Sequence, residues 1–106
     1  MIKEYKLTQP KSDVLLAMNK GGYFLIREKG LFSNYYILTP SGTLEGVRVD
    51  KHIFKFLQDT KLIEQIIDTS IRETYRLSLK GKKIADMHTR SLNTGGVGLK
   101  SVKVDA

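Results

Sequence analysis

The clearest hydrophobic pattern in the chain predicts an amphipathic helix that begins at Asp50 and ends near Leu62. Apolar positions recur there at helical spacing, and the positions between them are polar. The Asp50 carboxylate can accept hydrogen bonds from the free amides of the first turn, and Val49 can pack on Phe54 as a hydrophobic staple. The predicted buried face consists of Ile53, Phe56, Leu57 and Thr60. The predicted solvent face consists of Lys51, His52, Lys55, Gln58 and Asp59.

Two runs rich in aromatic and β-branched residues precede this helix and predict a β-hairpin. They are residues 23–28 and 34–39, and the Lys29-Gly30 pair between them is a natural turn. Residues 39–42 then have proline at the second and glycine at the fourth position, which favours a type I turn. A short strand over residues 44–47 is expected to follow this turn.

A short apolar run near the N-terminus, residues 14–18, predicts a helix of two to three turns. Ser12 or Thr8 can cap its start. The Gly21-Gly22 pair ends it, because glycine closes a helix in the left-handed conformation without a Cβ penalty. Residues 1–10 are mixed and show no clear period, so the pattern assigns no element to them.

A second hairpin and a last helix are predicted after the central helix. Residues 64–68 form one strand, residues 69–71 a loop, and residues 72–79 a second strand with clean alternation of apolar and polar positions. Ser78 can cap a basic helix over residues 79–88. The positions expected to face the core are Tyr75, Leu77, Leu79, Ile84 and Met87.

Length and composition predict one small folded domain. The chain has 106 residues, of which 41% are hydrophobic and 27% are charged, far from the composition of disordered chains. The domain is expected to span residues 1–90. Residues 91–106 are rich in Ser, Asn, Thr and Gly and are predicted to form a flexible, basic tail. An edge strand through Val102 and Val104 is the alternative for this segment.

Several classes of site are excluded by the residue types present. The chain has no cysteine and only two histidines, His52 and His88, so neither a metal nor another cofactor is expected. Both histidines are expected on the surface. Because Asp86 and His88 are two positions apart on a helix, they do not share a face and cannot form a catalytic pair. We therefore expect a protein that is not an enzyme.

The apolar runs are too short for a membrane segment or a secretory signal. The longest uninterrupted run is residues 14–18. The expectation is a cytoplasmic protein without membrane contact.

The order of elements after Asp50 resembles the second half of a winged-helix DNA-binding domain. The similarity covers about residues 48–88 and is carried by Leu62-Ile63-Glu64 and by residues 75–82, with the sequence YRLSLKGK. A winged helix has another helix immediately before its recognition helix, whereas this chain has a predicted hairpin there. The predicted fold class is therefore α+β, a small winged-helix-like domain with an additional N-terminal β-hairpin.

The resemblance implies a recognition helix starting at Asp50 and a wing tip over residues 68–72. Charge agrees with this, because the formal net charge is +7 and residues 72–90 hold six basic against two acidic residues. We therefore expect a non-catalytic protein that binds DNA or RNA, as a small transcription regulator or accessory factor. The expected nucleic-acid contacts are Lys51, His52, Lys55, Arg72, Arg76, Lys80, Lys82 and Lys83.

The aromatic residues of the first hairpin support an alternative function. Because consecutive strand residues point to opposite faces, Tyr35 and Tyr36 cannot be buried on the same side, and one ring is expected to be exposed near Arg27. Such a ring can stack on a base or anchor a protein partner. The alternative is therefore a protein-interaction module or inhibitor that docks on a macromolecular complex. The sequence also leaves open a homodimer formed through an unpaired edge of this hairpin.

The distribution of acidic residues is expected to discriminate between these functions. One continuous positive face favours a nucleic acid, whereas interruption of that face favours a protein partner. The acidic residues in question are Asp59, Glu64, Asp68 and Glu73.

Overall fold

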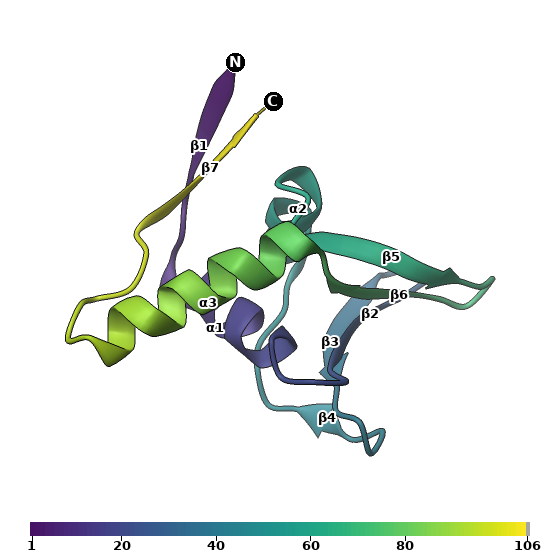
Figure 1. Cartoon of the computed structure of the whole chain (residues 1–106). Coiled ribbons are helices and arrows are strands. Elements are labelled where there is room, and N and C mark those ends of the chain that lie inside the picture. Colours follow the sequence, from purple (N-terminus) through teal and green to yellow (C-terminus); the bar gives the residue numbers. More distant parts are fainter. Residues whose placement is uncertain (106) are drawn as a thin grey trace.

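Within residues 1–105, three helices and seven strands follow one another (Figure 1). The structure is a computed structural model that describes residues 1–105. The elements in chain order are β1 (Ile2–Lys6), α1 (Gln9–Met18), β2 (Phe24–Glu28), β3 (Asn34–Leu38), β4 (Leu44–Glu45), α2 (Lys51–Asp59), β5 (Ile63–Asp68), β6 (Arg72–Leu77), α3 (Leu79–Asn93) and β7 (Ser101–Asp105).

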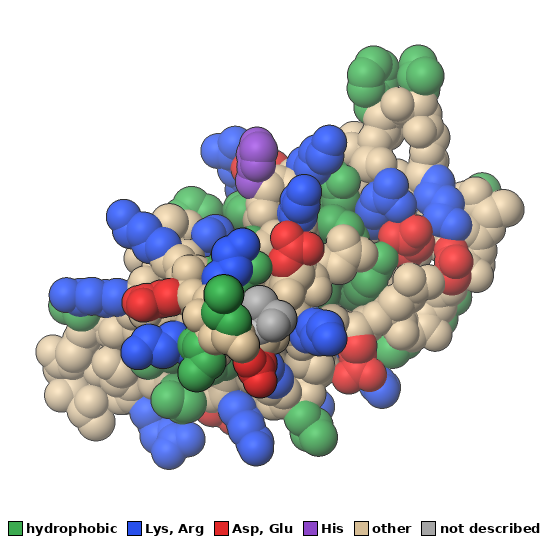
Figure 2. Space-filling model, turned by 90° about the horizontal axis from the view of Figure 1, so that it is seen from above, with side chains coloured by type: hydrophobic (Ala, Val, Ile, Leu, Met, Phe, Trp, Pro, Cys, Tyr) green, Lys and Arg blue, Asp and Glu red, His purple; other side chains and the backbone are tan. Residues whose placement is uncertain are grey.

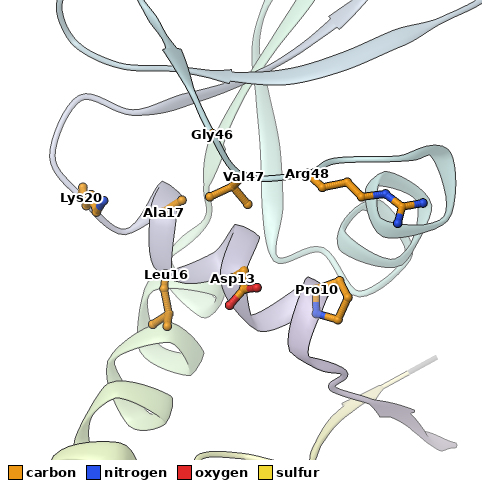
Figure 3. A pocket seen from close by; sticks show the side chains of 8 residues that line it. All are labelled: Pro10, Asp13, Leu16, Ala17, Lys20, Gly46, Val47 and Arg48. Atoms are coloured by element: carbon orange, nitrogen blue, oxygen red, sulfur yellow. The ribbon is translucent and has the colours of Figure 1, made fainter.

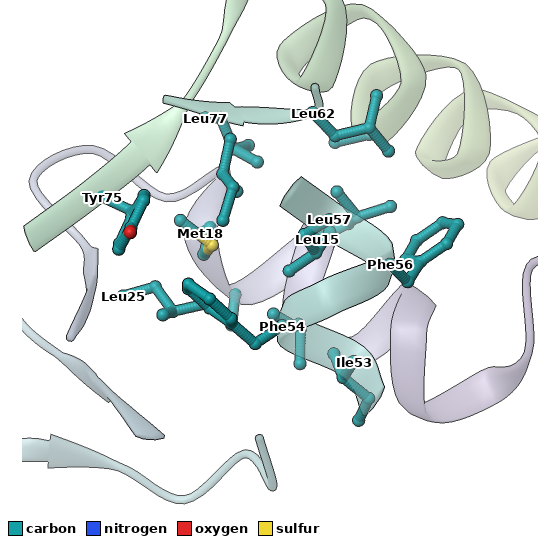
Figure 4. Close-up of a cluster of buried hydrophobic side chains, with 14 of the residues drawn as sticks. Leu15, Met18, Leu25, Ile53, Phe54, Phe56, Leu57, Leu62, Tyr75 and Leu77 are labelled. Carbon is teal, nitrogen blue, oxygen red and sulfur yellow. The ribbon is translucent and has the colours of Figure 1, made fainter. Parts of the chain in front are cut away.

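Five of the strands form one antiparallel sheet in the order β4-β3-β2-β6-β5. Leu25 of β2 lies opposite Ile37 of β3 and Tyr75 of β6, so these three side chains share one face of the sheet. That face packs on the helices, because all three residues belong to the same buried cluster as the apolar side chains of α1 and α2. Figure 4 shows Leu15 of α1 and Leu57 of α2 within this core.

The two ends of the chain form a separate antiparallel ribbon of β1 and β7, which projects from the helices in Figure 1. One face of the ribbon joins the core, since Val102 and Val104 are buried and the Tyr5 ring lies 5.8 Å from that of Phe56. The structure thus places a strand in residues 1–10, to which the sequence pattern assigns no element. The edge strand through Val102 and Val104 is confirmed.

The sequence-based boundary at Arg90 is also corrected. Helix α3 passes through that residue and continues to Asn93, and residues 101–105 form β7 instead of a tail without regular structure. Two inward-facing positions are wrong as well. Leu79 is 77% exposed because it begins α3 instead of continuing β6, and Met87 is 47% exposed.

The start of α1 differs in detail from the expectation. Thr8 occupies the N-cap position but makes no side-chain capping hydrogen bond. Ser12 does not cap the helix: it is buried within α1 and its hydroxyl donates to the Thr8 carbonyl over 3.2 Å. The predicted helix is therefore confirmed, but it begins at Gln9, before the apolar run of residues 14–18.

Both predicted hairpins form; the second is connected by residues 69–71, as predicted, whereas the connection of the first is longer than expected. The first hairpin is connected by residues 29–33, not by a tight Lys29-Gly30 turn. The turn at residues 39–42 closes as predicted, with the Gly42 amide donating to the Thr39 carbonyl over 2.9 Å. The strand after it contains only Leu44 and Glu45, so Val47 lies outside it.

The chain therefore forms a single α+β domain with two antiparallel sheets. The β5–β6 hairpin is an integral part of the larger sheet, because β6 also pairs with β2. Within residues 1–105, none of the helices combines the length and the apolar character needed to cross a bilayer.

Candidate functional site

Helix α2 presents a polar face above the core, and its sequence explains why. The Ile53 amide donates to the Asp50 side chain over 2.9 Å, so the predicted cap is confirmed. The helix ends at Asp59, three residues before the predicted end near Leu62, and Thr60 is its C-cap. The buried side chains are those predicted, with Phe54 in addition. The exposed residues are the predicted ones, Lys51, His52, Lys55, Gln58 and Asp59.

A cleft of about 390 Å³ separates this polar face from the helix-covered side of the sheet. Lys51 and Lys55 border the cleft from α2, while Arg27 and Tyr35 border it from β2 and β3. The cationic residues of α2 and the Arg27–Tyr35 pair, which no sequence pattern connects, thus share one site. The remaining lining residues are Phe54, Gln58, Asp59, Gln65, Glu73 and Tyr75.

The floor of the cleft is aromatic. The Phe54 ring lies 5.0 Å from the Tyr35 ring and 5.1 Å from the Tyr75 ring, measured between centroids. These contacts bury Phe54, which the helical spacing places beside the main apolar face. Val49 is half-buried against the same core, at the position expected for a staple residue.

Hydrogen bonds fix the charges on the sheet side of the cleft. Arg27 Nη1 lies 3.0 Å from Glu73 Oε2, and the Tyr75 hydroxyl donates to Glu73 Oε1 over 2.6 Å. A hydrogen bond with Tyr35, followed by the contacts with Glu73, raises the pKa of Arg27 above its ordinary value against the cost of burial. Burial, followed by the hydrogen bond to Glu73, raises the pKa of Tyr75. The Glu73 carboxylate is therefore compensated within the site.

The lysines on the helix side are not compensated in this way. Among residues 1–105, no carboxylate oxygen lies within 4.0 Å of the Lys51 or Lys55 ammonium group. Asp59 is the remaining acidic residue that borders the cleft. The site thus combines free cations, a compensated Arg–Glu pair and aromatic rings, a composition suited to an anionic ligand with planar groups.

The other predicted contact residues lie elsewhere. Arg72 lies opposite Glu28 in the sheet, on the face away from the helices. Arg76 lies on the same outer face and pairs with Glu64 at 3.4 Å. Along a strand, four residues separate these two arginines by about 13 Å. The outer face of β6 is therefore not continuous with the exposed face of α2.

The lysines of α3 form a third group. Lys82 and Lys83 are exposed and Lys80 is half-buried. Lys82 and Arg76 line another cavity, of about 410 Å³, where α1 leads into β2. The eight predicted nucleic-acid contacts are therefore divided among α2, the outer face of β6 and the start of α3.

Tyr35 and Tyr36 lie on opposite faces of the sheet, as the alternation requires. The expectation that one ring is exposed is wrong, because both side chains are half-buried. Tyr36 lies near Glu28 and Arg72, and burial together with the Glu28 charge raises the pKa of its hydroxyl. Only Tyr35 belongs to the cleft.

Three of the four acidic residues named above are bound by cations. Glu64 pairs with Arg76, Asp68 with Lys29 at 2.6 Å, and Glu73 with Arg27. In Figure 2, Asp and Glu side chains accordingly lie among the Lys and Arg side chains of the face that is seen. The positive surface is interrupted, and the uncompensated charge is local.

A further cavity of about 370 Å³ lies between α1 and the segment after β4 (Figure 3). Asp13 is the one carboxylate among its eight lining residues, which provide no acid–base pair. Within residues 1–105, no three His, Asp or Glu side chains are grouped so that they could hold a metal ion. Of the three cavities described, the Lys51–Arg27 cleft is the one lined by the most charged side chains.

His88 is a correction, because the sequence places it on the surface and the structure buries it at 6% exposure. Its Nδ1 accepts a hydrogen bond from the Leu99 amide over 2.9 Å. A Cβ atom at Gly98 would overlap the His88 ring, so the connection to β7 packs closely on this side chain. His88 is a structural residue of the C-terminal segment.

Comparison of the chain with protein-family models, curated proteins and solved structures finds no match. The residues of the cleft that sequence reasoning missed are Gln65, Glu73 and Tyr75, which line it from β5 and β6. Glu73 and Tyr75 are two positions apart in β6, so they lie on the same face of the sheet. No local signal reveals that Arg27, 46 residues earlier, lies against them.

Proposed function

We propose that the protein binds nucleic acid, without catalysis, through the exposed face of α2 and the adjoining cleft. The observation that carries this proposal is the pair Lys51 and Lys55, which lie one helical turn apart and have no carboxylate of residues 1–105 within 4.0 Å. Arg27 lies across the cleft from them. Backbone phosphates are the polyanion that such a cationic rim would favour.

The dimensions of α2 support a helix-in-groove arrangement. An α-helix with its side chains is about 10–12 Å across, and the major groove of B-DNA is about 12 Å wide. His52 and Gln58 lie on the same exposed face and can donate to or accept from base edges. The order α2, β5–β6 hairpin and α3 supports a winged-helix-like role as a regulator or accessory factor.

A second candidate function is docking on a protein partner. The interrupted positive surface favours it, because Arg27, Lys29 and Arg76 already have carboxylate partners. Tyrosine and arginine in one cleft are also typical of the residues that dominate protein interfaces. This candidate predicts at most weak, non-specific binding to nucleic acid that does not depend on Lys51 and Lys55, which the following experiment measures.

The test is fluorescence anisotropy of labelled duplex and single-stranded DNA and RNA, titrated over a range of salt concentrations. We expect affinity to fall linearly with salt on logarithmic axes. The double variant Lys51→Glu/Lys55→Glu should lower affinity about tenfold or more and reduce the salt slope by about 2. Its thermal stability should stay close to that of the parent, since both side chains are exposed.

The matched control is Lys82→Glu/Lys83→Glu, which changes the charge equally on another surface. If binding depends on α2, this control should cost less than about threefold in affinity. Equal losses in the two double variants would contradict a site at α2. Absence of binding at low salt would contradict the proposal as a whole and favour the protein partner.

A further inference from the structure

Two loop tips lie side by side at one end of the five-stranded sheet. They are residues 29–33, between β2 and β3, and residues 69–71, between β5 and β6, and the Lys29 amide donates to the Ile71 carbonyl over 2.9 Å. Each tip carries large apolar side chains in solvent. Leu31 is 92% exposed, Phe32 81% and Ile71 63%. Grouped exposed hydrophobic residues of this size mark interaction sites.

The two tips are tied together by polar contacts. Lys29 Nζ donates to Asp68 Oδ1 over 2.6 Å and to the Thr69 carbonyl over 2.7 Å. The Thr69 hydroxyl oxygen accepts from the amides of Ile71 and Arg72 over 3.4 and 3.1 Å. These contacts hold the loops in one arrangement, so little conformational entropy remains to be lost when a partner binds.

The tied tips continue the surface of the cleft. Arg27 and Tyr35 line the cleft and lie one pair before the end of the β2–β3 ladder, where the first loop begins. At 3.3 Å per strand residue, Leu31 is within about 13 Å of Arg27 along the chain. A polyanion held by α2 would therefore reach the tips. Arg72, exposed and next to Ile71, has no carboxylate within 4.0 Å among residues 1–105.

We propose that Leu31, Phe32 and Ile71 form an apolar wedge that inserts between neighbouring base pairs of the duplex held by α2. This inference rests on the proposed function. Apolar side chains beside cations enter the minor groove, unstack a base step and bend the duplex by about 20–90°. Arg72 begins β6 beside Ile71 at the tip, and no carboxylate of residues 1–105 compensates its charge. This charge favours a duplex as the occupant, because a phosphate beside the opened step would neutralise it.

A tryptophan at the tip reports the wedge directly. The chain contains no tryptophan, so Phe32→Trp introduces a single fluorescent indole at an exposed position. We expect duplex DNA to quench this emission by at least half at concentrations where anisotropy shows saturated binding, because the indole stacks on bases. Unchanged emission at saturation overturns the wedge and leaves the proposed function intact. Absence of anisotropy change overturns the proposed function itself.

The same variant tests another occupant. A blue shift with phosphatidylcholine–phosphatidylserine vesicles, without quenching by duplex DNA, would overturn the wedge in favour of a lipid surface. Emission that stays unchanged with both probes would also overturn it. Quenching by DNA that high salt reverses in parallel with the anisotropy supports it.

Duplex bending gives an independent measurement. Energy transfer between dyes at the two ends of a duplex should report a bend with the parent protein and none with Leu31→Ser/Phe32→Ser. Affinity should fall only about threefold to tenfold, since the cations remain. Leu44→Ser is the matched control, because Leu44 is 68% exposed on the distant edge strand β4. A bend that survives in the double variant overturns the wedge.

Discussion

Helices α2 and α3 look alike at their exposed surfaces and differ at their buried ones. Each starts with a side-chain cap, since Asp50 accepts from Ile53 and Ser78 from Gly81. Each also presents lysines to solvent. The buried residues of α2 are Ile53, Phe54, Phe56 and Leu57, whereas those of α3 are Gly81, Ala85 and His88.

The small buried residues bring the backbone of α3 close to its neighbours. A Cβ at Gly81 would overlap the Leu62 carbonyl oxygen, which also accepts from the Ser78 amide over 2.9 Å. In α2 the large side chains separate the helix from the sheet and leave a cleft beside it. Both helices carry exposed lysines, so the number of lysines does not distinguish them. The difference is that Lys51 and Lys55 of α2 border a cleft.

The largest expected effect is that of Gly81→Ala on stability. Because the added methyl meets backbone and not a flexible side chain, the variant should lose about 3 kcal/mol, or roughly 15 °C in Tm. Thermal unfolding followed by circular dichroism measures this loss. Gly46→Ala is the control, with no atom within 4 Å of its added Cβ, and it should change stability by less than about 0.5 kcal/mol. Equal stability of the two variants would contradict the close approach.

Removal of the caps separates the roles of the two helices. Asp50→Ala and Ser78→Ala should each cost about 1 kcal/mol. Only Asp50→Ala should also weaken nucleic-acid binding, because it loosens the first turn of α2, which holds Lys51. Chemical denaturation and anisotropy together test this. Equal binding losses in both variants would show that α3 contributes to the interface.

The connection after α2 allows a stabilising change. Lys61 has φ of 58°, a left-handed conformation that glycine adopts without strain. Lys61→Gly should therefore stabilise the protein by about 0.5 kcal/mol, measured by denaturant unfolding. If Lys61 also takes part in binding, affinity should fall while stability rises.

The smallest expected effect is on the pKa of Asp68. Asp68 pairs with Lys29, whereas Lys51 and Lys55 of α2 have no carboxylate partner among residues 1–105. The hydrogen bond from Lys29 lowers the pKa of the Asp68 carboxyl below its ordinary value. The ionised Asp68 carboxylate therefore contributes its full stabilisation above the pKa of Asp in the unfolded chain, about 3.9. This contribution is lost as the pH falls through the lower pKa of the folded state. Carboxyl NMR shifts should follow this titration. Lys29→Met should return the pKa of Asp68 to its ordinary range.

Local patterns predicted the parts of the fold whose determinants lie close together in sequence. The cap at Asp50, the apolar spacing of α2 and the alternation of β6 each involve residues within one element. The β1–β7 ribbon could not be predicted in this way, because residues 2–6 show no period and their partners are residues 101–105. Strand identity there depends on pairing with the other end of the chain.

In the candidate site too, some features depend on nearby residues and others on residues far apart in the sequence. Lys51 and Lys55 were predicted from helical spacing, and Tyr35 from strand composition. The carboxylates that compensate Arg27 and Arg76 belong to other strands, so the loss of a continuous positive face depends on sheet order. His88 looked like a surface residue because the segment that covers it, around Leu99, lies eleven residues further along.

The β1–β7 ribbon has a consequence for the folding mechanism. Its pairs join Ile2 to Asp105 and Lys6 to Ser101, so they close the longest loops that the described chain can form. Loop closure of this length is slow and is favoured only after the intervening chain is compact. The ribbon should therefore assemble after the folding transition state, with φ-values near zero at Val102 and Val104. Weakening it should accelerate unfolding and leave the folding rate almost unchanged.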